Sequence, residues 1–236
     1  MKQLLNMVKK ARGISFKLPA SCFCHRTSSP QLLTSIFPLP TSIFLIVLAL
    51  SGCTSKTFDT EEALWVHLKE EKNGYIHQKL VNGITYNIIY RPTDLLVKQE
   101  LPKNATQHTI DSLRNKYGQY LYFNLSMAAN NRELLSNVAG NKNQFGAMVN
   151  QLAFGMGDKV HLYTSKKDTI PLLDYIYPRM YGMSNSTTMM LVYPRDEKIT
   201  NEKYINISIE DIGLFTGEVT FKILVAPLKN EPKLKF

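Results

Sequence analysis

The 236-residue chain carries 28 lysine and arginine residues against 19 aspartate and glutamate residues, a formal net charge of +9. Six of the basic residues precede Cys53, which leaves 22 basic and 19 acidic residues in the rest of the chain. Phosphate binding needs basic residues gathered on the folded domain, so we expect no nucleic-acid partner. The cysteines are Cys22, Cys24 and Cys53, so residues 54–236 offer no thiol for a disulfide, a zinc site or nucleophilic catalysis, and we expect no cofactor.

An apolar run, Ile43–Leu50, follows a segment without acidic residues. The run is shorter than the about 20 residues of a transmembrane helix, and it fits the apolar core of a signal peptide. The basic residues before it are typical of a cytoplasmic leader: Lys2, Lys9, Lys10, Arg12, Lys17 and Arg26. We therefore predict a leader over residues 1–52. It is longer than a signal peptide needs and contains Pro30, Pro38 and Pro40, so a translation start further along the chain and an atypical leader both stay open.

The tetrapeptide Leu50-Ser51-Gly52-Cys53 closes the apolar run and resembles the lipobox of bacterial lipoproteins. Small residues before the cysteine let the processing enzymes reach the backbone, and the thiol is acylated before the cysteine becomes the mature N-terminus. The resemblance implies palmitate-type acyl chains on Cys53, and two or three such chains anchor a protein stably to a membrane. The alternative interpretation is a buried core segment that ends in Gly-Cys by chance.

Residues 53–59 are expected to form a short polar tether. In lipoproteins of the enterobacterial type, an aspartate directly after the cysteine retains the protein in the inner membrane; Thr54 stands there, which favours the outer membrane. Lys56 and the acids beyond it loosely resemble the surface-export signal of lipoproteins in the Bacteroidota, so both leaflets stay open. Asp111-Ser112-Leu113 and Asp168-Thr169-Ile170 match the O-glycosylation pattern of that phylum. The remaining chain resembles lipoproteins of the Bacteroidota, without a motif that fixes a domain family.

Residues 60–236 are expected to form one domain that begins with a helix over Thr60–Lys72. Asp59 or Thr60 can cap this helix, and acidic residues suit its first turn. Asn82-Gly83 then predicts a hairpin, because both residues tolerate the positive φ of a type I′ turn. The other elements of this half are two strands, Tyr75–Val81 and Ile84–Tyr90; a loop with a short helical piece, Thr93–Thr106; a helix, Thr109–Tyr117; a strand, Tyr120–Met127; and helices over Glu133–Val138 and Gln144–Phe154.

From Lys159 onward the pattern predicts strands, rich in β-branched and aromatic residues. The apolar residues of Val219–Val225 alternate with polar ones, and this segment should form a hairpin with Tyr204–Ile209. The remaining strands are predicted over Val160–Thr164, Ile170–Tyr177 and Thr187–Tyr193. The fold class is therefore α+β, with a mostly antiparallel sheet that is packed by helices or forms one side of a sandwich.

Two predicted strand ends repeat the tripeptide Tyr-Pro-Arg, at Tyr177–Arg179 and Tyr193–Arg195. Tyrosine faces stack on sugars or peptides, and arginines bind carboxylates. We therefore predict a ligand surface formed by Tyr175, Tyr177, Arg179, Tyr181, Tyr193 and Arg195. The alternative is that proline ends each strand while tyrosine and arginine cover its exit. Alternation along a strand predicts that Tyr175 and Tyr177 share a face.

No motif in the sequence declares a reaction or a metal site. There is no nucleophile elbow, zincin motif, phosphate loop or calcium loop, and the histidines lack metal-ligand spacing. Glu210 and Asp211 are adjacent and would point apart on a strand, which makes them a poor acid/base pair. We expect a lipid-anchored, non-enzymatic module that binds a glycan, a peptide or an outer-membrane protein. An exported hydrolase of glycans or peptides, and an accessory subunit of an outer-membrane assembly, are the alternatives.

Overall fold

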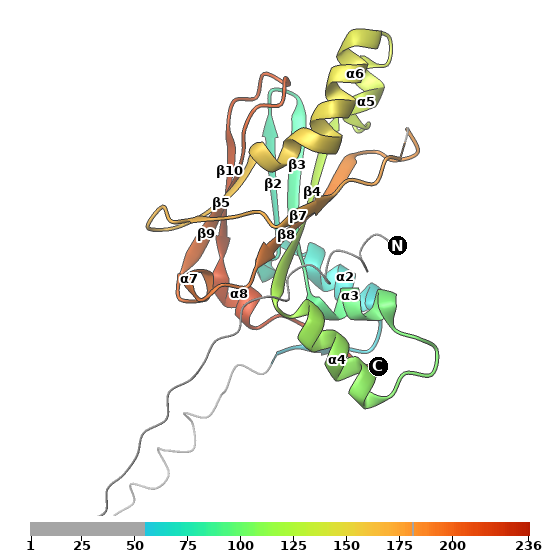
Figure 1. Ribbon diagram of the computed structural model, residues 1–236, viewed down its shortest axis with the longest axis vertical. Coiled ribbons are helices and arrows are strands. Elements are labelled where there is room, and N and C mark those ends of the chain that lie inside the picture. The colour runs from blue at the N-terminus through green and yellow to red at the C-terminus, as the bar shows by residue number, and fades with distance from the viewer. Residues whose placement is uncertain (1–54, 181) are drawn as a thin grey trace, which may run out of the picture. The chain divides into compact units, whose positions relative to one another are not determined.

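The computed structural model describes residues 55–180 and 182–236 (Figure 1). The predicted leader over residues 1–52, the predicted acylation site Cys53 and the predicted ligand residue Tyr181 lie outside the described residues. Within the described part the α+β prediction is confirmed, because helices pack beside two antiparallel sheets. The sequence pattern thus identified the correct fold class.

The larger sheet has five antiparallel strands in the order β2-β3-β4-β8-β7. In that order they span Ile76–Val81, Ile84–Arg91, Tyr120–Ala129, Thr187–Pro194 and Asp174–Ile176. The predicted hairpin between β2 and β3 is confirmed. Asn82 and Gly83 have φ angles of 48° and 75°, the left-handed region that a type I′ turn requires.

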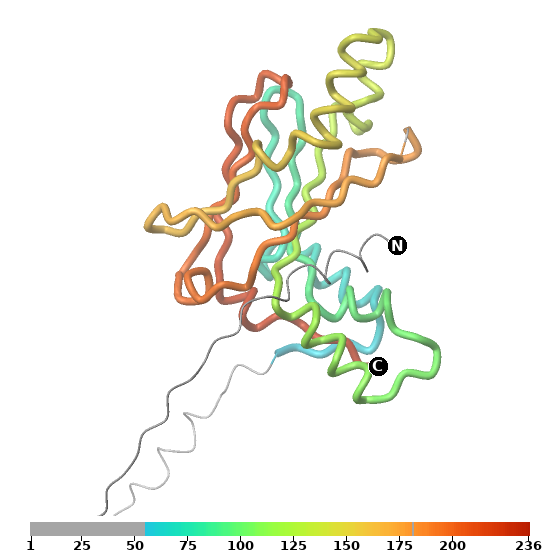
Figure 2. The backbone as a smooth tube through the Cα atoms, viewed as in Figure 1, coloured from blue at the N-terminus to red at the C-terminus, as the bar shows by residue number. Residues whose placement is uncertain are grey.

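The smaller sheet has four strands in the order β10-β9-β5-β6. They span Val219–Leu224, Tyr204–Ile209, Val160–Thr164 and Thr169–Ile170. The predicted hairpin between β9 and β10 is confirmed, since Ile209 lies opposite Val219 in an antiparallel register. The turns of this hairpin and of the β2–β3 hairpin lie side by side at one end of the sheets (Figure 2).

Helices gather at the two ends of the five-stranded sheet (Figure 1). At the end we call proximal lie α2 (Glu61–Lys69), α3 (Thr93–Glu100) and α4 (Gln107–Tyr117). At the opposite, distal end lie α5 (Leu134–Val138) and α6 (Lys142–Asn150). The short helical pieces are η4 (Glu71–Asn73), the π-helical turn η5 (Gln151–Gly155), η6 (Met156–Asp158), α7 (Glu197–Thr200) and α8 (Val225–Lys229).

The two sheets and α2 share one hydrophobic cluster. Ile88 and Phe123 enter it from the larger sheet, Ile207 and Phe221 from the smaller one, and Leu64 from α2, all at most 2% exposed. Burial of such apolar side chains is the main force that holds a domain together. The cluster therefore joins both sheets into a single α+β domain.

The predicted strand Ile170–Tyr177 is in fact two strands in different sheets. β6 ends at Ile170, and β7 begins at Asp174 beside β8 of the larger sheet. Pro171 has no backbone N–H to donate to a sheet, so the chain leaves the smaller sheet there. The predicted final strand is also one residue too long, because Val225 begins α8.

Candidate functional site

The segment that follows Cys53 is held by the C-terminal end of the chain. β1 (Thr57–Phe58) pairs in parallel with β11 (Lys233–Leu234). The N–H of Lys233 donates to the carbonyl of Lys56 at 2.9 Å, next to this pair. Because a chain extends at most about 3.6 Å per residue, the link from Cys53 to Thr57 spans roughly 14 Å or less. A lipid on Cys53 would hold β1 and β11 near the bilayer surface.

Asp94 of α3 ties this end of the chain to two helices. The residue is 3% exposed, and its carboxylate accepts two hydrogen bonds from Arg114 of α4, at 2.8 and 2.7 Å. It also accepts the N–H of Leu234 in β11 at 2.7 Å. The hydrogen bonds from Asp94 raise the pKa of Arg114 above its usual value, which favours the charged guanidinium. The β1–β11 pair is thus fixed to the body of the domain.

A second carboxylate, Glu231, closes the same end. It accepts the hydroxyl of Tyr90 at 2.7 Å, the N–H and hydroxyl of Thr93 at 2.9 and 3.0 Å, and a guanidinium N–H of Arg195 at 3.1 Å. Burial raises the pKa of Tyr90 well above its usual value, with the nearby Glu231 charge adding to the effect. Tyr90 is therefore a neutral hydrogen-bond donor, and the network joins β3, β8 and the C-terminal segment.

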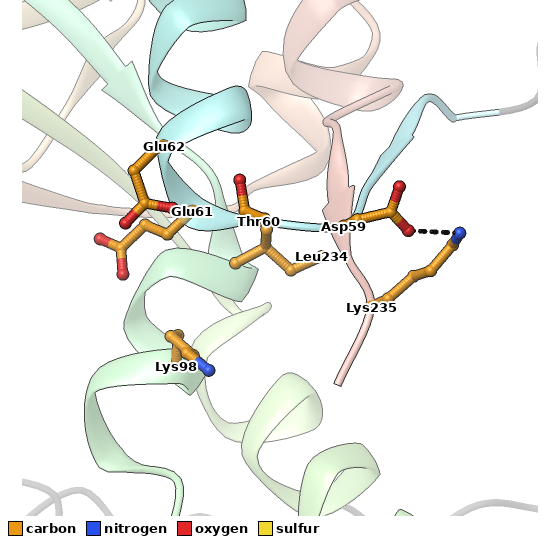
Figure 3. Close-up of a pocket in the computed structure, with 7 residues that line it drawn as sticks. All are labelled: Asp59, Thr60, Glu61, Glu62, Lys98, Leu234 and Lys235. Carbon is orange, nitrogen blue, oxygen red and sulfur yellow. Dashed lines mark hydrogen bonds and ion pairs between the residues drawn. The ribbon is translucent and has the colours of Figure 1, made fainter.

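A hollow of about 270 Å³ opens at the proximal end, beside the start of α2 (Figure 3). Figure 3 shows Glu61 and Glu62 on one side of it and Asp59 paired with Lys235 on the other, with a 2.5 Å contact between their charged groups. Lys98 of α3 completes the charged lining. The proximal end therefore presents charges of both signs next to β1.

The five predicted ligand residues that the structure describes do not come together on one surface. β7 and β8 are antiparallel neighbours, so their C-terminal ends lie at opposite ends of the sheet. Tyr177 and Arg179 follow β7 at the distal end, whereas Tyr193 and Arg195 belong to the end of β8 at the proximal end. The repeated tripeptide therefore marks two separate places.

Tyr193 and Arg195 make their contacts inside the domain. Tyr193 is 0% exposed and its ring meets Phe123 edge-on, with 6.4 Å between centroids. Burial raises the pKa of Tyr193, which keeps its hydroxyl neutral. Arg195 is bonded to Glu231 and Tyr90. This arrangement matches the alternative interpretation, in which tyrosine and arginine cover the exit of a strand.

The other members of the set lie near the β7 edge. Tyr175 and Tyr177 are both half-buried and pack against the hydrophobic cluster, so they contact the core as a pair. Arg179 is exposed to solvent, and Tyr181 is outside the described residues. Among the predicted residues that the structure describes, Arg179 alone is classed as exposed.

Two further carboxylates hold loops at the distal end. Glu133, which is 3% exposed, accepts the N–H of Gly182 at 2.6 Å. Asp211 accepts the N–H groups of Leu214 and Phe215 at 2.8 and 3.1 Å. Glu133 joins segments that are distant in sequence, as the two proximal carboxylates do, whereas Asp211 holds its own loop. Their hydrogen-bonding capacity serves the backbone of this chain.

Glu210 contacts partners different from those of its neighbour Asp211. It accepts Lys159 Nζ at 2.8 Å and contacts His161 Nε2 at 2.9 Å. The hydrogen bonds from Lys159 and His161 lower the pKa of Glu210. A general acid needs a raised carboxyl pKa, so this shift runs against that role.

No family model, no curated protein and no solved structure matches the chain. Within residues 55–180 and 182–236, no three His, Cys, Asp or Glu side chains are grouped to hold a metal ion. Over the same ranges, no helix has the length and apolar character needed to cross a membrane.

We predict that the domain loses stability as the pH falls below about 6.5, the unperturbed pKa of histidine. Burial lowers the pKa of His77, while a hydrogen bond to Gly74 and the charge of Glu71 oppose the shift. The unfolded chain then binds a proton at a pH where folded His77 is still neutral, so stability is present above 6.5 and declines below it. Urea unfolding of wild type and His77→Gln at pH 7.5 and 5.0 measures the effect. An equal loss in both would exclude His77 as its source.

Proposed function

We propose that this chain is a lipid-anchored, non-enzymatic binding module of the outer membrane, attached through Cys53. The lipobox resemblance and the basic leader support the anchor. The observation that carries the proposal is the pairing of β1 with β11, which leaves only residues 54–56 between Cys53 and a fixed strand. A domain on so short a link stays close to its membrane, with its proximal end toward the lipid.

The distal end then points away from that membrane. The eight residues of β3 lead from one end to the other, roughly 25 Å at about 3.3 Å per residue. Four of the most exposed large hydrophobic side chains belong to distal segments: Phe215 at 86%, Met183 at 78%, Phe154 at 74% and Leu80 at 71%. Two of them, Leu80 and Phe215, belong to adjoining hairpins, and neighbouring exposed apolar groups are typical of interaction sites. This distribution supports a protein or peptide partner over a glycan.

The carboxylates support binding over hydrolysis. A glycoside hydrolase needs two carboxyl groups that face a common substrate, one of them with a raised pKa. Here Asp94, Glu133, Asp211 and Glu231 accept main-chain N–H groups of this chain. Their role in the structure is to hold loops and termini. An accessory role in an outer-membrane assembly is a form of the same proposal, since it also needs an exposed apolar surface.

Metabolic labelling with an alkyne fatty acid tests the anchor. We expect the full chain to take up the label and to sediment with membranes, and Cys53→Ala to lose both properties. Cys22→Ala is the matched control, because it removes a cysteine from the predicted leader and should leave labelling unchanged. Persistent label, or undiminished membrane association, in Cys53→Ala would count against the anchor.

A further inference from the structure

Phe215 is the most exposed large hydrophobic side chain in the described part of the chain, at 86%. It lies in the loop between β9 and β10, at the distal end. Its φ angle is 56°, a left-handed conformation that is uncommon for a bulky residue and costs free energy. Neither burial nor backbone preference therefore explains a phenylalanine here. Strained residues that persist in a structure often serve function.

The conformation of Phe215 is held by specific hydrogen bonds. Asp211 Oδ2 accepts its N–H at 3.1 Å, and Asn82 Nδ2 in the β2–β3 turn donates to its carbonyl at 3.1 Å. The next residue, Thr216, is bonded to the hydroxyl of Tyr86 in β3 at 2.9 Å. The loop is thus bonded to the neighbouring hairpin at Phe215 and Thr216 and to its own Asp211, so the ring projects from a supported backbone.

The residues around Phe215 in the two turns are uncharged apart from Asp211, whose carboxylate accepts the N–H groups of Leu214 and Phe215. We define the distal tip as Leu80–Ile84 of the β2–β3 hairpin together with Ile212–Gly217 of the β9–β10 loop. These two segments contain only Leu, Val, Asn, Gly, Ile, Phe and Thr. Leu80, which is 71% exposed, adds a second apolar group to the tip. Depletion of charge around an aromatic anchor is typical of the centre of a protein interface.

We propose that the distal tip docks into a protein partner that presents an uncharged, apolar pocket for the Phe215 ring. The proposal rests on the proposed function only in taking the chain to be a binding module; it does not require the lipid. An uncharged side chain such as Phe215 fits an uncharged pocket. A charged group buried against the ring would lose its water without gaining an opposite charge, which costs free energy. Phe215 would be the residue that carries most of the binding energy, with Leu80 beside it.

The charges that flank the tip favour a protein over a lipid surface. Lys79, Asp211 and Glu218 border it, one basic residue against two acidic ones, whereas attraction to anionic lipids needs a cluster of basic residues. Two apolar side chains also offer less contact with hydrocarbon than one acyl chain, which itself binds membranes only marginally. The proximal location of the proposed anchor would further hold the tip away from that bilayer.

A second copy of this chain is a poorer fit. The hollow beside β1 is lined by charged groups, among them Asp59 and Glu61. Another hollow on α2 includes Glu62 and Lys69 beside Trp65. Neither offers the uncharged lining that the tip requires.

Site-specific photocrosslinking in the organism that makes the protein tests this proposal. The full chain is produced with p-benzoylphenylalanine at position 215, and in a parallel strain at position 66. Val66 is the matched control, because it is apolar and 63% exposed but lies on α2 at the proximal end. We expect one discrete protein adduct from position 215 that is absent from position 66. Mass spectrometry identifies the partner, which is then purified for titration.

In the titration, we expect Phe215→Asn to weaken binding at least tenfold and Val66→Ser to leave it unchanged. Asn tolerates a positive φ, so Phe215→Asn should unfold at the same temperature as wild type or higher, which separates lost binding from lost folding. An adduct with lipid, an adduct of two copies of this chain, the same adduct from both positions, or no adduct overturns the proposal. Fatty-acid labelling of the same cells reports on the anchor separately, so failure of the tip and failure of the anchor are distinguishable.

Discussion

Glu231→Ala is expected to lower the free energy of unfolding by about 3–5 kcal/mol, because it leaves a buried partner charge unpaired. Arg195 has only 20% of its side chain exposed and forms its ion pair with Glu231. The substitution also removes the acceptor for Tyr90 and for both donors of Thr93. Urea unfolding at neutral pH measures the loss.

Two companion variants show whether the network is the cause. Glu218→Ala removes an exposed glutamate and should change stability by less than about 0.5 kcal/mol. In Glu231→Ala/Arg195→Met no charge is left unpaired, so we expect the double variant to regain part of the loss. A Glu231→Ala protein as stable as wild type would show that the network contributes little.

Local sequence patterns predicted most of the helices, strands and turns, because interactions between nearby residues determine these elements. Thr60 caps α2 by accepting the N–H of Ala63 at 3.1 Å, and Asn82-Gly83 forms its turn through positive φ angles. Alternation also predicted the pairing of β9 with β10, where one face must enter the core. Each of these signals comes from residues that are close together in the sequence. It can therefore be detected in a single sequence.

What the sequence did not show depends on contacts between distant residues. β1 and β11 are each two residues long, which is too short to show a periodicity. They pair although they lie near opposite ends of the sequence of the domain. Asp94 and Glu231 belong to no sequence motif. Their roles depend on where the C-terminal segment that contains β11 lies in the fold. The left-handed φ of Phe215 likewise has no signal in the local sequence.

The predicted ligand surface failed as a unit for a topological reason. Similar tripeptides at the ends of two consecutive strands look adjacent in sequence. In an antiparallel pair, however, one strand ends where the other begins, so Arg179 and Arg195 are separated by the length of the sheet. A motif repeated at the C-terminal ends of two consecutive strands indicates a shared site when the strands run parallel, because those ends then lie at the same edge of the sheet.

The second large effect concerns Asp94, whose replacement by alanine should lower the free energy of unfolding by about 3 kcal/mol. The variant loses both bonds from Arg114 and leaves the buried N–H of Leu234 without its acceptor. We expect less than the upper range of such effects, since Arg114 is 30% exposed and water can solvate it. Asp111→Ala on α4, which removes an exposed carboxylate, should stay within about 0.5 kcal/mol of wild type.

The same substitution should also loosen the link to the proposed lipid anchor. β11 is the partner strand of β1, so weakening its attachment frees the chain from Cys53 as far as Thr60, where α2 is capped. The free link would lengthen by about 10 Å, since three more residues can extend. Trypsin should then cut after Lys56 faster in Asp94→Ala than in Asp111→Ala at a temperature where both are folded. On membranes from labelled cells this cut would release the domain from its lipid. An unchanged rate of release would show that Asp94 does not hold the β1–β11 pair in place.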